Sequence, residues 1–221
     1  MKVLIGTPAH DGKVVCDYCI NMAEIFRINA QENRGYDLHL YFMMYKSMVQ
    51  EARNDIFYKA YTENYDALVF IDADQSFKTE TFFRILSHPV DVVGVPVPKK
   101  QIKEGYNIRP EDPKNHKWDK EVNLLVVECI GTGFIKYSRK AIETLWNNSE
   151  SYGPNNENRL ICNYRIYKGG IIGEDIDICY KLEEAGIPIY VDIEDTCSHF
   201  GTHRFEGNYQ DYLIKNSLES V

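Results

Sequence analysis

Two aspartates that follow an apolar run are the residues of this sequence best suited to chemistry. Asp72 and Asp74 come directly after residues 67–71, an apolar segment with β-strand character. Side chains two positions apart in an extended chain point the same way, so both carboxylates can converge on one cation. Oxygen ligands suit Mg²⁺ or Mn²⁺, and such a cation neutralises a diphosphate that departs as a leaving group. Asp-x-Asp also occurs in turns and acidic loops, but the strand before it favours a metal site.

A second acidic motif, Glu174 and Asp175, follows Gly173 and opens a segment with helical periodicity. Acidic residues in a first helical turn interact favourably with the helix dipole, so a purely structural role is possible for both. A carboxylate at the edge of a substrate crevice can instead take a proton from an acceptor hydroxyl. Asp175 is the first candidate for this general base, and Glu174 is the second.

A histidine late in the chain is a candidate third metal ligand. His199 follows the last expected strand, where its imidazole could complete the coordination of the cation at Asp74. Cys197, His199 and His203 could instead form a zinc site, but no fourth ligand lies nearby in the sequence.

Glycines mark another loop that could approach a ligand. In Gly131-Thr132-Gly133 the missing side chains would let the backbone come close to a bound molecule. The same two glycines could equally shape a β-bulge or a tight corner.

The elements that must position these residues alternate along the first half of the chain. Apolar periodicity predicts strands at 2–7, 38–43, 67–71 and 91–95 and helices at 14–31, 47–64 and 79–87. This alternation predicts a parallel sheet covered by helices. In such sheets the ligand crevice lies beyond the carboxyl ends of the strands, where the loops 7–9, 72–74 and 96–98 would meet.

Local patterns predict the cap of the second helix and the buried face of the first. Ser47 and Gln50 fit a capping box at the start of the second helix. Cys16 and Cys19 have redox-motif spacing, but with Val15 and Ile20 they would share one face of the first helix, which predicts core packing.

The second half is organised differently. Residues 96–118 are rich in Pro, Lys, Asn and Asp, which predicts a long loop of the kind that often serves as a lid. Further elements are predicted as strands at 124–130 and 187–191 and helices at 138–146 and from Gly173 to a stop at Gly186.

Composition limits the partners. The chain has 221 residues, 44% of them hydrophobic, which suits one α/β domain. A net charge of -8 argues against nucleic-acid binding and against a polybasic membrane patch. The sequence has no apolar run long enough to cross a bilayer and no signal-peptide core, so a cytoplasmic location is expected.

The order of these motifs resembles a known family. Residues 7–9, 72–74, 131–134, 173–175 and 199–201 look like the motifs of metal-dependent nucleotide-sugar glycosyltransferases of GT-A fold. The similarity spans nearly the whole chain, and it extends to glycosyltransferase domains of chlorella-virus proteins that build capsid glycans. The resemblance implies one GT-A domain: a mostly parallel central sheet flanked by helices, with a smaller mixed sheet on the acceptor side. Its nucleotide-binding half would span 1–98, its acceptor and catalytic half 99–207, and a tail 208–221.

The resemblance also implies roles for single residues. Asp74 would bind Mn²⁺, or Mg²⁺, directly, and His199 would be a late metal ligand. Asp72 would contact the ribose or the metal shell, and Arg53 resembles the family's basic residue that faces the nucleotide. The loop of Thr7, Pro8 and Ala9 would seat the nucleobase, and the donor site would also include Ala73, Gly131, Thr132 and Gly133.

The expected activity is transfer of a hexose or deoxyhexose, such as rhamnose, from a UDP-sugar to a glycan hydroxyl in glycoprotein glycan synthesis. For a viral protein this would take place in the host-cell cytoplasm. If the enzyme inverts the anomeric centre, Asp175 acts as the base; if it retains it, the carboxylate only orients the sugar. Two alternatives stay open, a sugar nucleotidyltransferase and a non-catalytic module that binds nucleotide or glycan. The sequence does not determine the oligomeric state.

Overall fold

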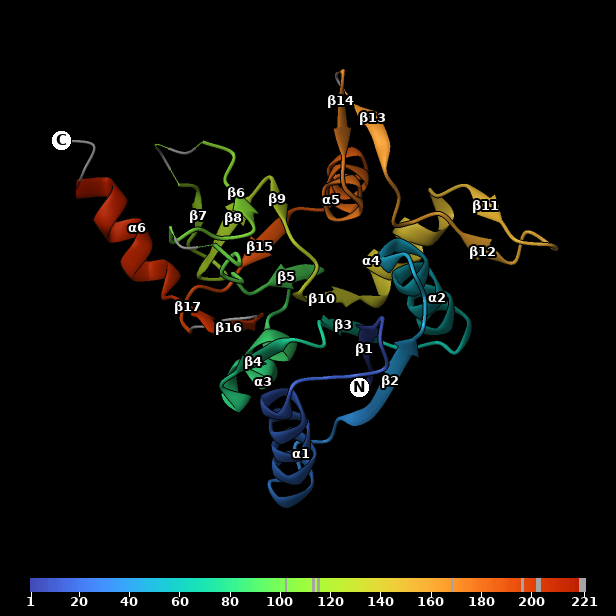
Figure 1. Ribbon diagram of the computed structural model, residues 1–221, viewed down its shortest axis with the longest axis horizontal. Helices are drawn as coiled ribbons and strands as arrows, with labels where there is room; N and C mark the ends of the chain where they lie inside the picture. Colours follow the sequence, from blue (N-terminus) through green and yellow to red (C-terminus); the bar gives the residue numbers. More distant parts are fainter. Residues whose placement is uncertain are drawn as a thin grey trace.

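The centre of the fold is an eight-stranded sheet (Figure 1). The computed structural model describes residues 1–101, 103–112, 114, 116–167, 169–195, 197–201 and 204–218. The strand order is β2-β1-β3-β10-β5-β15-β8-β7. The strands are β1 (Lys2–Ala9), β2 (Asp37–Met44), β3 (Ala67–Ile71), β5 (Val92–Gly94), β7 (Trp118–Asp119), β8 (Leu124–Val127), β10 (Phe134–Ser138) and β15 (Ile189–Val191).

The sheet is parallel where the sequence predicted it and mixed beyond that point. β1 pairs in parallel with β2 and β3, and β15 pairs in parallel with β5. β10 runs antiparallel between β3 and β5, and β8 runs antiparallel to β15. The α/β fold class is therefore confirmed. Strand β10 was not predicted, because a glycine corner was expected before a helix at 138.

Helices cover both faces of this sheet (Figure 1). On β1, Leu4 packs into one hydrophobic core, while Val3 and Ile5 pack into the other, as alternation along a strand requires. The first core includes Ile56 of α2 and the second includes Tyr18 of α1. The helices are α1 (Cys16–Gln31), α2 (Val49–Thr62), α3 (Thr79–Ser87), α4 (Arg139–Asn147), α5 (Glu174–Glu184) and α6 (Tyr209–Leu218). Within the described residues, none of these helices is both long and apolar enough to cross a membrane.

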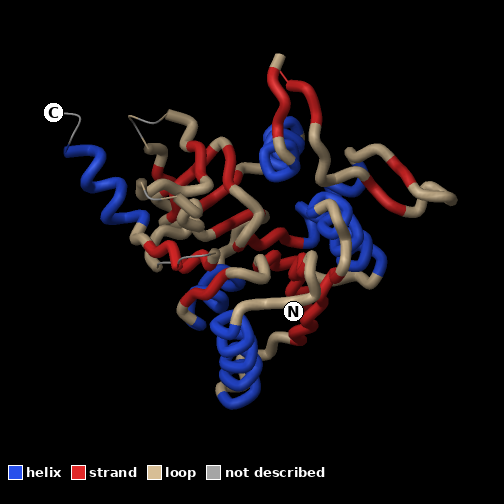
Figure 2. The backbone as a smooth tube through the Cα atoms, in the orientation of Figure 1, coloured by secondary structure: helices blue, strands red, loops and turns tan. Residues whose placement is uncertain are grey.

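Short strands surround the central sheet (Figure 2). β4 (Gln75–Phe77), β16 (Cys197–Phe200) and β17 (Arg204–Glu206) form a separate antiparallel sheet, in which His199 lies opposite Gln75. This pairing places the end of the chain beside the loop that follows β3. The other strands are β6 (Ile108–Arg109) with β9 (Cys129–Ile130), β11 (Ser151–Tyr152) with β12 (Asn158–Arg159), and β13 (Arg165–Tyr167) with β14 (Gly170–Ile172).

Two local predictions were wrong. Helix α2 begins at Val49, its N-cap is the extended residue Met48, and no side chain caps it, so Ser47 and Gln50 form no capping box. Cys16 and Cys19 are exposed, as is Ile20. The buried face of α1 is instead formed by Tyr18, Met22, Ile25 and Ile28, because these larger side chains remove more apolar surface from water.

The later segments are more regular than predicted. The loop 96–118 is folded back on itself by a bridge between Pro98 and Tyr106 and contains strand β6. The strand predicted at 124–130 is divided between β8 and β9, which pair in different sheets. In the segment 208–221, residues 209–218 form helix α6, and residues 219–221 lie outside the described residues.

A buried lysine in the middle of the sheet makes stability depend on pH. Lys136 of β10 is 4% exposed and donates a hydrogen bond of 2.7 Å to the His88 carbonyl. Burial lowers its pKa to about 8, and Asp91 opposes this only weakly. An unfolded lysine titrates near pKa ~10.4, so between these two values the unfolded chain binds more protons and stability rises with pH.

We therefore expect Lys136→Met to remove this rise. One pKa unit corresponds to about 1.4 kcal/mol. The unfolding free energy of the wild type minus that of the variant should therefore increase by about 2 kcal/mol from about pH 8 to about pH 10. Urea unfolding of both proteins across this range measures the difference, in which the other titrating groups cancel. If the difference in unfolding free energy between the two proteins does not change with pH, the buried lysine does not cause the rise in stability.

Candidate active site

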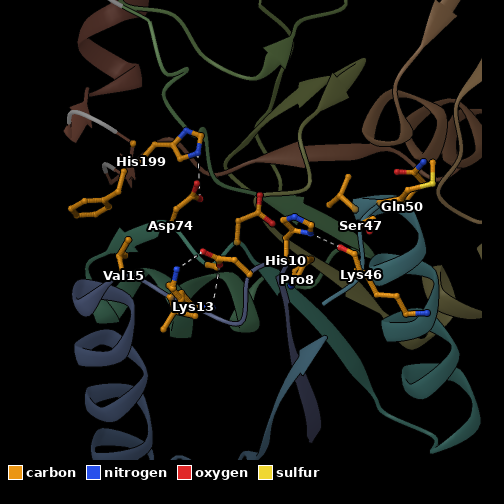
Figure 3. A pocket seen from close by; sticks show the side chains of 18 of the residues that line it. Pro8, His10, Lys13, Val15, Lys46, Ser47, Gln50, Asp74 and His199 are labelled. Atoms are coloured by element: carbon orange, nitrogen blue, oxygen red, sulfur yellow. Dashed lines mark hydrogen bonds and ion pairs between the residues drawn. The ribbon is translucent and has the colours of Figure 1, made fainter. Parts of the chain in front are cut away.

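Asp74 and His199 face each other at the carboxyl end of β3 (Figure 3). The backbone N–H of Phe200 donates to the Asp74 carbonyl at 2.8 Å, which joins β16 to the aspartate loop. His199 Nε2 lies 3.4 Å from Asp74 Oδ1. His199 Nδ1 lies 2.8 Å from the Pro98 carbonyl oxygen, which can only accept, so Nδ1 carries the proton of this bond. In the neutral ring, the Nε2 lone pair then points at a carboxylate oxygen.

Two acceptors that face each other are an arrangement a cation would bridge. Two atoms that bind one small divalent cation octahedrally at ~2.1 Å lie about 3 Å apart, close to the observed separation. A second hydrogen bond that orients the imidazole, as Pro98 provides here, is typical of metal-binding histidines. Within the described part of the chain, no group of three or more His, Cys, Asp or Glu side chains is placed to hold a cation. The residues therefore fit a cation of the Mg²⁺ or Mn²⁺ type, which usually takes one or two carboxylates and completes its coordination with substrate phosphates and water.

Asp74 is ionised at neutral pH. Partial burial raises its pKa, but the hydrogen bonds and charges of its neighbours, Lys100 among them, outweigh this and hold the pKa below the ordinary value. The Lys100 ammonium pairs with Asp74 Oδ2. A permanent negative charge at this position suits both the ammonium and a divalent cation.

Arg53 of α2 binds two carboxylates that come from distant parts of the chain. The side chain is buried, with its Nη2 3.1 Å from Asp72 Oδ1 and its Nη1 2.5 Å from Glu174 Oε1. Burial and these two carboxylates act on the guanidinium in opposite directions, and the carboxylates prevail, so its pKa is raised. Arg53 thus connects the loop after β3 to the start of α5. In this arrangement the guanidinium is occupied by protein carboxylates.

We expect Arg53→Met to destabilise the fold. The change leaves Asp72 and Glu174 without their cation, and breaking a buried pair on one side costs about 3 kcal/mol or more. Thermal or urea unfolding measures the loss. The triple variant in which Asp72→Asn and Glu174→Gln accompany Arg53→Met should recover much of it, because no buried charge then lacks a partner. Failure of this rescue would show that the loss comes from packing.

Two adjoining cavities meet at Asp72 and His199, which line both. The larger cavity has a volume of about 970 Å³ and is open to solvent. Its lining includes Pro8, Val15, Ser47, Gln50, Ala73, Asp74 and Lys100. The smaller cavity has a volume of about 240 Å³, and its lining includes Arg53, Gln75, Asn107, Gly131, Thr132, Gly133, Glu174 and Asp175.

The glycines of the smaller cavity leave room for neighbouring side chains. A Cβ at Gly131 would overlap the Asn107 side-chain amide, and one at Gly133 would overlap the amide of Gln75. The glycines therefore let two amide side chains approach the backbone next to Asp72. Between them, the Thr132 hydroxyl is buried and has no hydrogen-bond partner in the described residues. A buried hydroxyl without a partner is uncommon in folded proteins.

The acidic residues of α5 have different surroundings. Glu174 pairs with Arg53, while Asp177 pairs with Arg165 at 2.5 Å and with Lys181 at 2.9 Å. Asp175 accepts a hydrogen bond from the Ile176 backbone N–H at 2.8 Å, and within the described residues no basic side chain pairs with it. Asp175 also lines the smaller cavity. Of these three carboxylates it is the one left to accept a hydrogen bond from an acceptor hydroxyl.

Thr7, Pro8 and Ala9, which were expected in a loop, form the last residues of strand β1. Pro8 lines the larger cavity, but Thr7 is buried and its hydroxyl bonds to Tyr18 Oη at 2.5 Å. Ala9 is buried as well. Ala73 lines the same cavity, and its carbonyl accepts a hydrogen bond of 2.9 Å from the Val15 N–H, which positions the start of α1 there.

No pattern in the sequence pointed to Gln75, Asn107 or Lys100 as site residues. Amides and lysines follow no diagnostic spacing. Gln75 lies at the start of β4, directly after Asp74, while Asn107 and Lys100 reach the site through the fold of the loop 96–118. The zinc alternative gains no support from Cys197, which is buried and bonded to the Ser76 carbonyl; His203 lies outside the described residues.

Comparison with known proteins shows the fold. The sequence matches no family model and no curated protein. Among solved structures, A197 from STIV superposes with a TM-score of 0.53 at 18% identity, covering 91% of this chain and 86% of that one. The structure of S. aureus TarS residues 1–349 in complex with UDP-GlcNAc superposes with a TM-score of 0.50 at 12% identity. That match covers 88% of this chain and 56% of the TarS structure, so the chain spans little more than half of the latter. This chain therefore has the GT-A fold that its sequence motifs resemble.

Proposed function

We propose that the protein is a divalent-cation-dependent glycosyltransferase that moves a sugar from a UDP-sugar to a glycan hydroxyl. One observation carries the proposal. The Asp74–His199 pair lies where a cavity of nucleotide size joins a small polar cavity that Asp175 lines. Metal-dependent transfer from a nucleotide sugar needs a cation at the diphosphate, a nucleotide site on one side of it and a sugar site on the other.

The two cavities divide the donor between them. The larger cavity has a volume of about 970 Å³, within the range of small-molecule sites, and would take the nucleotide against Pro8 and Val15. The smaller cavity would take the transferred hexose or deoxyhexose. Its amides, Gln75 and Asn107, are groups that bind sugar hydroxyls. The UDP-GlcNAc complex of TarS supports UDP as the nucleotide.

Asp74 and His199 would hold Mn²⁺ or Mg²⁺, with Asp72 next to them. A cation bound there supplies charge neutralisation for the departing diphosphate. The protein's own residues would position the donor and exclude water from the sugar, which accounts for much of the rate enhancement in such reactions. Asp175 would accept the proton of the acceptor hydroxyl in an inverting reaction, or orient the sugar in a retaining one.

The resemblance of the motifs adds a biological setting. We propose a glycan of a glycoprotein as the acceptor and the cytoplasm as the location, that of the host cell if the protein is viral. The sugar nucleotidyltransferase alternative is less favoured. Its phosphate loop would have to lie near residues 9–13, where Lys13 is paired with Asp11.

Calorimetric titration with UDP tests the proposal. Binding with Mn²⁺ that is lost with a chelator is the expected result. A panel of UDP-sugars should then show one from which UDP is released when a glycan acceptor is added. If UDP, GDP and dTDP all fail to bind with Mn²⁺, the proposed function is wrong. Saturable binding of the nucleotide without turnover of any sugar donor would favour a non-catalytic binding module.

A further inference from the structure

Lys100 lies beside the position proposed for the cation at Asp74. Its ammonium pairs with Asp74 Oδ2, while His199 faces the other oxygen of the same carboxylate. Lys100 also lines the larger cavity. It comes from the loop 96–118, which the sequence predicts as a candidate lid. The proposed sugar transfer does not yet involve Lys100.

The loop around Lys100 is closed at its base and is tied to His199. The Lys99 N–H donates to the Gly105 carbonyl at 2.8 Å, and the Asn107 N–H donates to the Val97 carbonyl at 3.2 Å. The intervening Pro98 supplies the carbonyl that accepts the hydrogen bond from His199. Lys100 therefore lies two residues beyond a group that orients a metal-site histidine, so its placement beside Asp74 follows from the same backbone.

Most charged side chains of the site are paired within the protein. Arg53 offsets Asp72 and Glu174, Lys13 pairs with Asp11, and Lys46 pairs with Asp55. Lys100 is the lysine in this lining that pairs with Asp74. A divalent cation at Asp74 would lie next to this ammonium, and two positive charges so close repel each other. The anionic diphosphate of a donor would remove the conflict, because it can bind the cation and the ammonium together.

We propose that Lys100 is a donor-binding residue that neutralises Asp74 before the donor arrives and moves to the diphosphate when a divalent cation takes its place. The inference rests on the proposed function. It predicts that the free protein binds Mn²⁺ weakly and that metal and nucleotide each strengthen the binding of the other. The lysine stem is flexible enough for this exchange, and its side chain is 38% exposed.

Mn²⁺ binding without nucleotide tests the exchange directly. The electron paramagnetic resonance signal of free Mn²⁺ is followed while protein is added, for the wild type and for Lys100→Met. The variant keeps most of the stem and loses the charge, so it should bind Mn²⁺ about tenfold more tightly, within the range of ordinary coupling between sites. Lys103→Met, an exposed lysine of the same loop, is the charge-matched control and should bind as the wild type does.

Two further arms complete the test. In the double variant Asp74→Asn with Lys100→Met the gain should disappear, because the carboxylate that receives the metal is gone. UDP binding at saturating Mn²⁺ should be about tenfold weaker in Lys100→Met than in Lys103→Met.

The Mn²⁺ arm and the UDP arm separate the two proposals. Equal Mn²⁺ affinity in the wild type and Lys100→Met, including no measurable binding in both, overturns the role of Lys100. Tighter Mn²⁺ binding in Lys100→Met without any UDP binding would support the competition at Asp74 and overturn both the proposed function and the transfer of Lys100 to a diphosphate.

Discussion

Asp74→Asn is expected to abolish the Mn²⁺-dependent part of UDP binding. The change keeps the shape of the side chain but removes the charge that faces His199 Nε2 at 3.4 Å. Loss of an outer-shell partner alone often costs metal affinity by about 10- to 100-fold, so loss of the charged ligand should cost about 100-fold or more. Calorimetry with UDP, with Mn²⁺ and again with chelator, gives the metal-dependent part as the difference.

The matched control for this variant is Asp17→Asn. Asp17 is an acidic residue of the first turn of α1 and is absent from the lining of both cavities. It loses the same charge, so it separates a specific effect from the general change in net charge. Asp74→Asn should also fold normally, because Asp74 is only partly buried and its removal frees Lys100 to the solvent. Unchanged Mn²⁺-dependent affinity in Asp74→Asn would show that the metal site lies elsewhere.

Asp175→Asn is expected to reduce sugar transfer sharply and to leave UDP binding unchanged. General-base assistance contributes about 10²- to 10⁴-fold to such reactions, and an amide cannot accept the proton. The decrease should appear in kcat, because Asp175 lines the smaller cavity and not the larger one assigned to the nucleotide. The bond from Asp175 to the Ile176 N–H can be kept by the asparagine oxygen, so α5 should retain its first turn.

Glu183→Gln, an exposed change on the same helix, provides the comparison for Asp175→Asn. The anomeric configuration of the product, read by NMR, decides how the result is interpreted. An inverted product together with a decrease of this size supports Asp175 as the base. Full transfer activity in Asp175→Asn would show that Asp175 is not the general base, whatever the anomeric configuration of the product.

Local patterns in the sequence identified much of the framework. The apolar run at 67–71 is β3, with the same bounds, because a segment apolar at every position must be buried on both faces of a sheet. Helix α3 also has its predicted bounds, Thr79–Ser87. The position of Asp72 and Asp74 follows from the first of these, since the chain leaves the core where the apolar run stops. The start of α5 at Glu174, and with it the position of Asp175, was likewise readable from the glycine and the acidic first turn.

What each side chain faces was decided by the tertiary structure. Arg53 binds carboxylates 19 and 121 residues away, and Lys100 meets Asp74 across 26 residues. The pairing of β16 with β4, which carries His199 to Asp74, joins segments more than a hundred residues apart. Periodicity and capping report only the burial and geometry of neighbours along the chain. The sequence by itself therefore determined where β3, α3 and the start of α5, and the carboxylates beside them, would lie. Only the folded chain decided which charges would meet, because that depends on how distant segments pack.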